Sequence, residues 1–583
     1  MSTPPSPLPS APAWPHCAHG ADPATDPLGC RGIQVAGHTT CLAHLPDPDR
    51  AAYLTGLTPG ARIDHRGTPL TESLLAQLLG ALRDPATGKP RLGPARFDGA
   101  QFSGAAIFDA VQFSDIAEFG RAQFSGPAMF VGAQFSSSVV FVGAQFSGPA
   151  EFGRAQFSGP AGFAGAQFSG PAEFGRAQFS DLAWFRDAQF SDTARFDRTQ
   201  FGGGTLFGPV VCAGSVVLAG AVFRVPLTLE IAAQEVNCER TRWDSTAIIR
   251  LRYAAVDLSH AVLSAPVAVT AHPVPFGAVI DTGVDESLLA GRPTGVRVTS
   301  VQGVDAAHLV LTDTDLSDCL FSGAFHLDQI RLEGRTTLAS VPTGWHHRGI
   351  WPVRWTRRRT LAEEHHWRAQ SAGQEVLPPR AVTPPPRQWR CGPYHPDPAL
   401  TPDPEDVAAL YRQLRKAFED SKNEPGAADF YYGECEMRRH DRTGTPKGER
   451  RLLWAYWFLS GYGLRASRAA GWLLTAMSLT VLLLMGFGLP THDPEPATTG
   501  TLHGHKISLT TTAPDPALHG EWHQRLTWAR AEKGTRVAVN SVVFRSSGQN
   551  LTTAGTYIEM TSRLLEPTLL ALAALAVRGR IKR

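Results

Sequence analysis

Phenylalanine recurs along the middle of the chain at alternating intervals of five and six residues. Between residues 97 and 207 it occurs 21 times without a missed interval, which gives an eleven-residue period. Two residues before each phenylalanine is a small or β-branched residue, alanine in 17 of the 21 cases. Gly, Ser and Pro fill many of the intervals, as in "AQFSGPAEFGRAQFSG" at 144–159. The fold must therefore bury the same pair of side chains every few residues.

The intervals exclude a helix and favour short strands. Steps of five and six residues at about 100° each would direct successive rings to different sides of a helix, and Ser-Gly-Pro would break it. In a strand, residues i−2 and i face the same way, so each Ala-x-Phe triplet predicts a strand with Ala and Phe inward. Gly and Pro supply the corners. Four triplets make one coil of about 22 residues, and stacked coils form a solenoid whose stability accumulates along one dimension.

The phenylalanine rings are predicted to stack along the axis of this solenoid. Each buried ring contributes about 2–3 kcal/mol. The core of the repeat is predicted to include Phe124, Phe130, Phe135, Phe141, Phe146, Phe152, Phe157, Phe163, Phe168 and Phe174.

The triplets resemble the pentapeptide-repeat family, whose A-x-[LF]-x-x units wind into a right-handed four-sided β-helix. This sequence departs from the family by an extra residue in every second unit. The resemblance implies a right-handed quadrilateral β-helix, or β-solenoid. We extend it over 95–340, with an irregular stretch near 265–300, because Leu258 and Leu263, and later Leu316 and Phe321, are again five residues apart.

The surface charge of the repeat bears on its partners. Some members of the family bind DNA gyrase by imitating DNA, which requires a strongly acidic rod. Residues 95–207 contain ten Asp or Glu and seven Arg, so the net charge is only −3. This disfavours DNA gyrase as a partner, although a DNA-mimic, gyrase-interacting protein stays a second alternative. The mixed charge favours a rod that binds another protein, which the sequence does not name.

The N-terminal segment, 1–94, contains a candidate metal site and a helix. Cys17, Cys30, Cys41 and His44 are four ligands that suit tetrahedral zinc, and such a zinc would be structural. His16, His19 and His38 are spare candidates, and buried thiols without a metal are the alternative. "TESLLAQLLGALRD" predicts a helix capped by Thr71 that covers the first coil.

Two linking segments follow the repeat. Residues 341–404 begin with interleaved Trp and Arg, which fit either a cap of the solenoid or contact with anionic lipid or nucleic acid, and continue into a Pro-rich linker. Residues 405–450 predict a helical hairpin that binds a partner or oligomerises. "EEHH" at 363–366 is not a metalloprotease motif, because its histidines are adjacent. The sequence shows no nucleophile with a paired base, so we expect no enzyme.

Residues 451–583 predict a two-span membrane region. Ala469–Leu489 is 21 residues without a charge, enough to cross a bilayer. Basic residues before it and after 577 predict that both termini and the β-helix are cytoplasmic, at a bacterial inner membrane. A second span, Tyr557–Val577, would include Glu559, Arg563 and Glu566 on one helical face. Such a face predicts a homo-oligomer with these charges inward; the alternative is an interfacial half-helix.

The residues before the second span suggest a different function. "TTAG" at 552–555 resembles the "TTVG" filter of two-span cation channels, which makes Thr552, Thr553 and Gly555 pore-loop candidates. The sequence departs from the channels directly after Gly555, where Tyr-Gly-Asp is missing. A membrane-anchored, protein-binding scaffold in contact with membrane lipid is therefore our main hypothesis, and an ion-channel-like pore subunit with a cytoplasmic β-helix is the alternative.

Overall fold

A computed structural model describes residues 11–581, except for 23–25, 277–284, 343–344, 349–350, 356, 375–387, 391–400, 493–494, 505, 513, 520 and 544–547. It divides into two compact units, 1–402 and 403–583, which are described separately. Most of the predicted Pro-rich linker lies outside the described residues, as do the last two basic residues of the chain.

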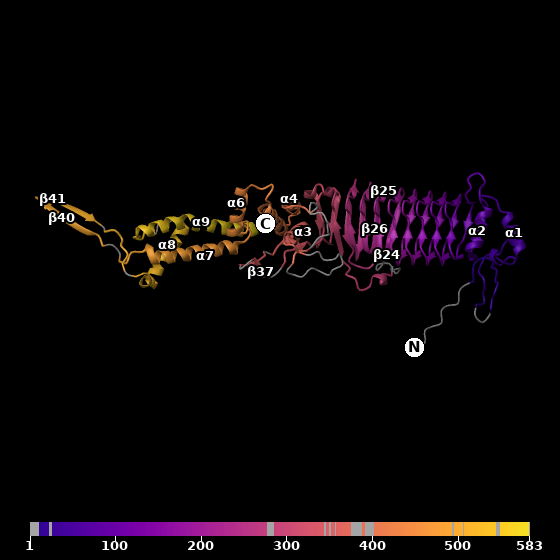
Figure 1. The fold of residues 1–583 in the computed structure, drawn as a ribbon, viewed down its shortest axis with the longest axis horizontal. Coiled ribbons are helices and arrows are strands. Elements are labelled where there is room, and N and C mark those ends of the chain that lie inside the picture. The colour runs from indigo at the N-terminus through magenta and orange to yellow at the C-terminus, as the bar shows by residue number, and fades with distance from the viewer. Residues whose placement is uncertain are drawn as a thin grey trace, which may run out of the picture. The chain divides into compact units, whose positions relative to one another are not determined.

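The first unit contains a β-solenoid (Figure 1), and the pairing of its strands defines four sides. Each Ala-x-Phe triplet forms one side, with its first and third residues buried and its middle residue outward. Parallel pairing joins residues 22 apart, such as Ala95 with Ala117 and Phe124 with Phe146. The predicted coil of about 22 residues and the predicted solenoid are therefore confirmed.

The sides are numbered here in chain order. Side 1 consists of β1 Ile63–Asp64, β4 Ala95–Arg96, β8 Ala117–Glu118, β12 Val139–Val140, β16 Ala161–Gly162 and β20 Ala183–Trp184. Side 2 consists of β2 Pro69–Thr71, β5 Gln101–Ser103, β9 Gln123–Phe124, β13 Gln145–Phe146, β17 Gln167–Phe168 and β21 Gln189–Phe190. Side 3 consists of β6 Ala106–Ile107, β10 Ala128–Met129, β14 Ala150–Glu151, β18 Ala172–Glu173 and β22 Ala194–Arg195. Side 4 consists of β3 Arg91–Leu92, β7 Gln112–Phe113, β11 Gln134–Phe135, β15 Gln156–Phe157, β19 Gln178–Phe179 and β23 Gln200–Phe201, and it continues into β25 Val222–Phe223, β27 Arg242–Trp243 and β30 Val262–Leu263.

The rings stack as the sequence predicts. Phe146 lies 4.8 Å from Phe124 and 4.7 Å from Phe168, centroid to centroid, and the three rings are nearly parallel. Rings on neighbouring sides meet edge to face, as Phe146 and Phe152 do at 6.1 Å. Both arrangements are favourable for aromatic quadrupoles, so the stack gains more than burial alone provides.

The coils become shorter in the second half of the solenoid. After Phe223 the paired residues are 20 apart, so that Phe223 lies above Trp243 and Trp243 pairs with Leu263. Longer strands then form sides 1 to 3 without a sharp corner between every triplet. They are β24 Thr205–Val217, β26 Leu227–Asn237, β28 Ala247–Arg252, β29 Ala255–Asp257, β31 Val267–Ala271, β32 Val296–Ser300, β33 Leu309–Thr312, β34 Thr314–Asp315 and β35 Arg331–Glu333.

Helices cover both ends of the solenoid. At the N-terminal end are α1 (Asp47–Thr55) and α2 (Glu72–Ala81), and the Thr71 side chain caps α2 by accepting from the Leu74 N–H. Leu74, Leu75 and Leu78 of α2 are buried. At the other end, β36 (Ala339–Ser340) pairs with β39 (Arg359–Thr360), and α3 (Ala362–Ser371) follows. A small hairpin of β37 (Trp345–Arg348) and β38 (Trp351–Arg354) precedes α3.

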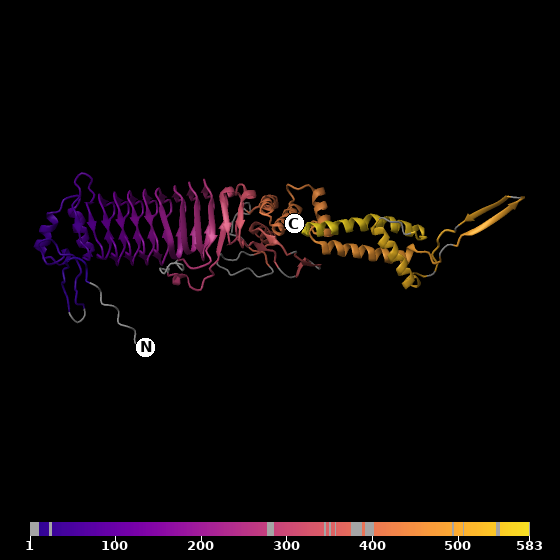
Figure 2. The same cartoon turned by 180° about the vertical axis from the view of Figure 1, so that it is seen from behind.

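The second unit is helical. α4 (Pro404–Asp420) and α5 (Glu424–His440) form a hairpin, followed by α6 (Lys447–Ser460) and the long helix α7 (Ala466–Leu483) with a π-helical turn (Leu484–Gly488). A hairpin of β40 (Ala497–His503) and β41 (Lys506–Thr512) leads to α8 (Trp528–Val542) and α9 (Thr553–Ile581). α7 and α9 lie side by side in both views (Figures 1 and 2).

Candidate functional site

The four predicted metal ligands lie together in the N-terminal segment. The ligand atoms of Cys17, Cys30, Cys41 and His44 are all within 4.8 Å of one another. The Sγ atoms of Cys30 and Cys41 are 3.7 Å apart, and His44 Nδ1 lies 3.5 Å from Cys17 Sγ and 3.4 Å from Cys41 Sγ. Metal–sulfur bonds of about 2.3 Å in a tetrahedron give edges of about 3.8 Å. The cluster therefore has the dimensions of a tetrahedral metal site, whereas its S–S separation is too long for a disulfide.

Local structure explains how distant cysteines meet. A single 3-10 turn, Leu42–His44, places His44 on the same side as Cys41. The Cys17 N–H donates to Gly32 O, and the Gly32 N–H donates to Cys30 Sγ. A Cβ at Gly32 would come within 2.9 Å of the Cys41 side chain, so this position needs glycine.

The thiols of Cys30 and Cys41 differ in pKa. A hydrogen bond from Cys41 lowers the pKa of Cys30 to about 5, and the same bond together with burial raises the pKa of Cys41. A thiolate, not a thiol, is the form that binds a metal. The spare histidines lie outside this set: the ring of His19 stacks on His44 at 4.1 Å, and His38 Nδ1 is 3.9 Å from Asp49.

The outer surface of side 1 carries apolar residues. From the fourth coil onward, successive outward positions stack on one another and form what we call the apolar stripe. It consists of Val140, Gly162, Trp184, Leu206, Thr228, Ile248, Ala268 and Val310. Leu206 is 55% exposed, Ile248 42% and Trp184 38%. Exposed apolar side chains that are aligned on one face of a protein are typical of interaction surfaces.

A groove deepens the apolar stripe in its C-terminal half. Its volume is about 520 Å³, which falls within the range of roughly 300–1,000 Å³ that is typical of ligand pockets. Its lining includes Leu206, Ile248, Val310, Pro226 and Pro266. The groove is therefore mostly apolar, with threonine hydroxyls among its walls.

The other sides differ from side 1. Sides 2 and 4 present columns of glutamine, such as Gln145 above Gln167, and the Gln112 amide donates to Gln134 at 3.3 Å. On side 3, Glu151 and Glu173 are adjacent, but Arg195 follows and lies 3.5 Å from Glu173. In the described part of the solenoid, no side presents an unbroken column of carboxylates.

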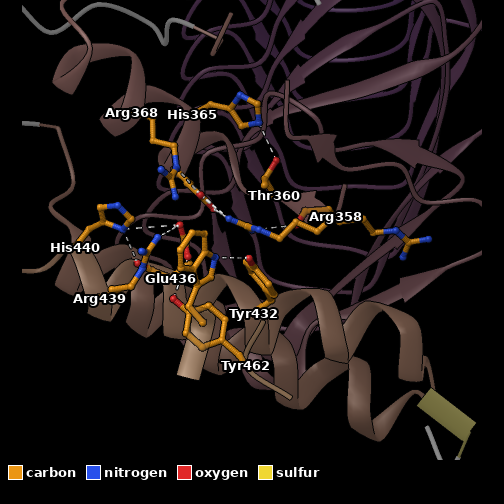
Figure 3. Close-up of polar contacts among 12 residues, drawn as sticks. Arg358, Thr360, His365, Arg368, Tyr432, Glu436, Arg439, His440 and Tyr462 are labelled. Atoms are coloured by element: carbon orange, nitrogen blue, oxygen red, sulfur yellow. Dashed lines mark hydrogen bonds and ion pairs between the residues drawn. The ribbon is translucent and has the colours of Figure 1, made fainter. Parts of the chain in front are cut away.

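The segment after the solenoid holds a buried polar cluster (Figure 3). The Glu364 carboxylate accepts from Arg358 at 2.5 Å and from Arg368 at 2.7 Å, and all three side chains are buried. His365 Nε2 lies 2.7 Å from the Thr360 hydroxyl, and burial lowers the pKa of His365 to about 3. The "EEHH" residues are therefore part of a structural cap, which is the first of the two interpretations given for this segment above.

Glu363 connects this cap to the last coils of the solenoid. Its Oε1 accepts from the backbone N–H groups of Phe321 and Ser322. Burial raises the pKa of Glu363. The carboxylate thus satisfies two N–H groups that the end of a strand stack would leave without partners.

The hairpin of α4 and α5 also contains buried charge. Glu434 accepts from Arg412 at 3.0 Å and from Arg415 at 2.8 Å. Glu436 accepts from Arg439 at 2.7 Å and from the Tyr462 hydroxyl at 3.0 Å (Figure 3). These glutamates bind α5 to its neighbours.

Two helices of the second unit are long and apolar enough to cross a membrane, Ala466–Gly488 and Thr553–Arg578. Most of their side chains are not buried in the described structure, and Leu474, Leu479 and Leu564 are among the most exposed. These two helices run antiparallel, because Gly488 at the end of the first contacts Gly555 at the start of the second.

The pore-loop candidates have a different environment from the one predicted. Thr553 and Gly555 lie in the first turn of α9, where backbone carbonyls accept from later residues of the helix instead of facing a pore. The Thr552 hydroxyl donates to Phe487 O at 2.8 Å. A Cβ on Gly555 would overlap the Gly488 backbone. The "TTAG" segment therefore joins the two long helices tightly, and it forms no extended filter loop.

The charged residues of α9 make contacts within one chain, although Glu566 Oε2 and Arg563 Nε are buried without a hydrogen-bond partner. Arg563 lies 2.7 Å from Glu559, one turn away. The fully buried Glu566 accepts from the Thr480 hydroxyl of α7 at 2.8 Å. The predicted pairing along one helical face is present for Glu559 and Arg563, whereas Glu566 contacts α7.

Sequence reasoning missed the apolar stripe and the contact of Glu363 with the last coils. The stripe was readable as the middle residue of every fourth triplet, because that residue always faces outward. The contact of Glu363 with Phe321 joins residues 42 apart and has no local signal.

Comparison with known proteins identifies the repeat. A family model described as pentapeptide repeats (9 copies) matches residues 92–134, 119–167, 130–178 and 163–211. No curated protein and no solved structure matches the chain.

Proposed function

Because this chain is a pentapeptide-repeat protein, we propose that it is a non-catalytic scaffold, held at a membrane by α7 and α9, whose apolar stripe binds a partner protein. Proteins of this family are generally protein-interaction scaffolds. The observation that carries the proposal is the alignment of Trp184, Leu206 and Ile248 on one side of the solenoid.

The chemistry of the stripe favours a protein as its partner. Exposed Leu, Ile and Trp gain free energy when they leave water, at about 25 cal/mol per Å² of apolar surface. A nucleic acid would need columns of Arg or Lys, which side 1 lacks from Val140 to Val310 in the described coils. The mixed charge of side 3 gives no support to binding of DNA gyrase by mimicry.

Site-specific photocrosslinking tests the stripe. We expect a photoreactive residue at position 206 to trap a partner in the native host, and Ile248→Glu to abolish that crosslink. The matched control is Gln167→Glu, which places the same charge on side 2 and leaves the crosslink intact. Crosslinks only to a second copy of this chain would show self-association instead, and a crosslink that survives Ile248→Glu would refute the proposal.

We also propose a bacterial inner membrane as the location, with the solenoid and both termini in the cytoplasm. Arg450, Arg451 and Arg465 precede the first candidate span, and Arg580 follows the second. The antiparallel contact of Gly488 with Gly555 supports two crossings. Retention in membrane pellets after alkaline carbonate extraction is the expected result, and release of the chain would contradict it.

The Cys17, Cys30, Cys41 and His44 cluster supports a structural zinc. Zinc would fix three distant parts of a segment that has few large apolar residues. We expect about one zinc per chain by mass spectrometry of the purified full chain, and its loss in Cys41→Ser. Cys212→Ser, which removes a buried thiol of the solenoid, is the control. Equal zinc in both variants would exclude this ligand set.

A further inference from the structure

A pocket lined by cationic side chains lies where α5 ends and α6 begins. Its volume is about 340 Å³, and its lining residues are Arg439, His440, Lys447, Arg450, Arg451 and Trp454. The lining therefore contains four side chains that carry a full positive charge, a histidine and one aromatic ring, and it includes no carboxylate.

Most of this positive charge is not neutralised inside the protein. Arg439 lies 2.7 Å from Glu436, and His440 Nδ1 lies 3.9 Å from the same carboxylate. Arg450 donates to the backbone oxygen of Asp441. Within the described part of the chain, Lys447 and Arg451 have no ion-pair or hydrogen-bond partner from another side chain. The pocket is thus suited to an anion with several acceptor oxygens.

An aromatic path leads from the pocket to the first candidate span. Trp454, a wall of the pocket, is 52% exposed and stacks on Phe458 at 5.3 Å. Phe458 in turn lies 4.6 Å from Trp472 of α7, whose indole N–H donates to Phe458 O. Tryptophan rings prefer the boundary between the headgroups and the hydrocarbon of a bilayer. The pocket is therefore placed at that boundary if α7 crosses the membrane.

We propose that this pocket binds the phosphate of an anionic lipid headgroup, with the lipid's apolar part along Trp454, Phe458 and Trp472. The inference rests on the proposed membrane anchoring. Basic residues supply the charge that recognises the phosphate. The aromatic path favours a lipid over a soluble anion, because a soluble anion has no apolar part to pack on the rings.

Lipid retention by the full chain tests the proposal. The purified protein is transferred to mixed micelles that contain phosphatidylglycerol and phosphatidylcholine, and native mass spectrometry counts the lipids that stay bound. We expect selective retention of phosphatidylglycerol. Lys447→Gln combined with Arg451→Gln is expected to reduce that retention at least about tenfold, since each basic residue near an anionic surface contributes to affinity. Both side chains are exposed, so folding is preserved.

The controls separate lipid binding from general charge and from anchoring. Arg121→Gln combined with Arg154→Gln removes the same charge from exposed corners of the solenoid and leaves retention unchanged. Trp454→Ala is expected to weaken retention while leaving all basic residues in place. Displacement of the lipid by millimolar inorganic phosphate would overturn the proposal in favour of a soluble anion. Unchanged retention in the double variant of a chain that resists carbonate extraction would refute the pocket alone, whereas release by carbonate would refute the anchoring as well.

Discussion

At the scale of single residues, the stack of aromatic rings ends in a histidine. Register places His65 on side 1 where Phe97 stands in the next coil, and their ring centroids are 6.2 Å apart. His65 Nδ1 is buried without a hydrogen-bond partner, and burial lowers the pKa of His65 to about 4. A titratable ring thus occupies a position that the repeat otherwise gives to phenylalanine.

This histidine predicts a loss of stability in mild acid. The unfolded chain takes up a proton at His65 below pH 6.5, but the folded chain does so only near pH 4, so stability falls as the pH drops through this window. The loss is up to about 3 kcal/mol. We expect His65→Phe to flatten the dependence of the unfolding free energy on pH between 6.5 and 4. An unchanged slope in denaturant titrations would show that His65 is not responsible.

A glycine at a solenoid corner provides a second prediction at this scale. Gly165 has φ +63°, and a Cβ there would meet nothing within 4 Å, so strain is the only cost of a side chain. We expect Gly165→Ala to lower stability by about 1 kcal/mol in thermal melts. Gly153→Ala is the control, because its φ is ordinary and its Cβ would make only a 3.8 Å contact. Equal effects of the two would contradict the argument. Arg154 already adopts φ +59° at an equivalent corner, so the fold tolerates the strain.

At the scale of elements, the sequence predicts the regular phenylalanine repeat better than the coils at the two ends of the solenoid. The eleven-residue period of Phe97–Phe207 is enough to derive strand, corner and coil, because every triplet repeats the same inward pair. The first coil was missed because β1 and β2 contain no phenylalanine. The 20-residue coils were predicted only loosely, since Phe223, Trp243 and Leu263 share a column without sharing a residue type.

The candidate sites also differ in how far the sequence predicts them. The Cys17, Cys30, Cys41 and His44 set was predicted from residue types, since thiols and a histidine have few other uses in so polar a segment. The pocket at α6 was not predicted, because the sequence does not give the angle at which the short link between α5 and α6 sets the two helices. The "TTAG" segment was expected as a loop, but Thr553–Gly555 begin α9, and Gly555 packs closely on Gly488.

The α3 cap gives a prediction for this scale. Glu363→Gln keeps an oxygen that accepts from the N–H groups of Phe321 and Ser322. It removes a buried carboxyl group whose pKa is raised by burial. We expect the variant to melt at or above the wild-type temperature at pH 8, because a raised pKa means that ionisation costs stability there. Glu363→Ala leaves two N–H groups without an acceptor and should cost about 1–3 kcal/mol. A Gln variant as unstable as the Ala variant would show that the negative charge itself is needed.

At the scale of the whole molecule, the solenoid stores its stability in contacts between neighbouring coils. Phe152 is fully buried and stacks on Phe130 at 4.9 Å and on Phe174 at 4.8 Å. We expect Phe152→Ala to cost about 3–5 kcal/mol by calorimetry. Phe325→Ala, which removes a ring that is 61% exposed, should change little. A small effect at Phe152 would mean that the coils repack around the missing ring.

The covered ends of the stack limit how copies of this chain can meet. A pile of parallel strands normally offers an open rim that templates further strands, which is how fibrils grow. Here α2 packs against β2 and β6 at one rim, and Glu363 accepts from backbone N–H groups near the other. These contacts oppose end-to-end stacking of two copies, so the length of the solenoid is set by the number of coils in one chain. Any assembly of several copies must form through the flanks of the rod or through the second unit.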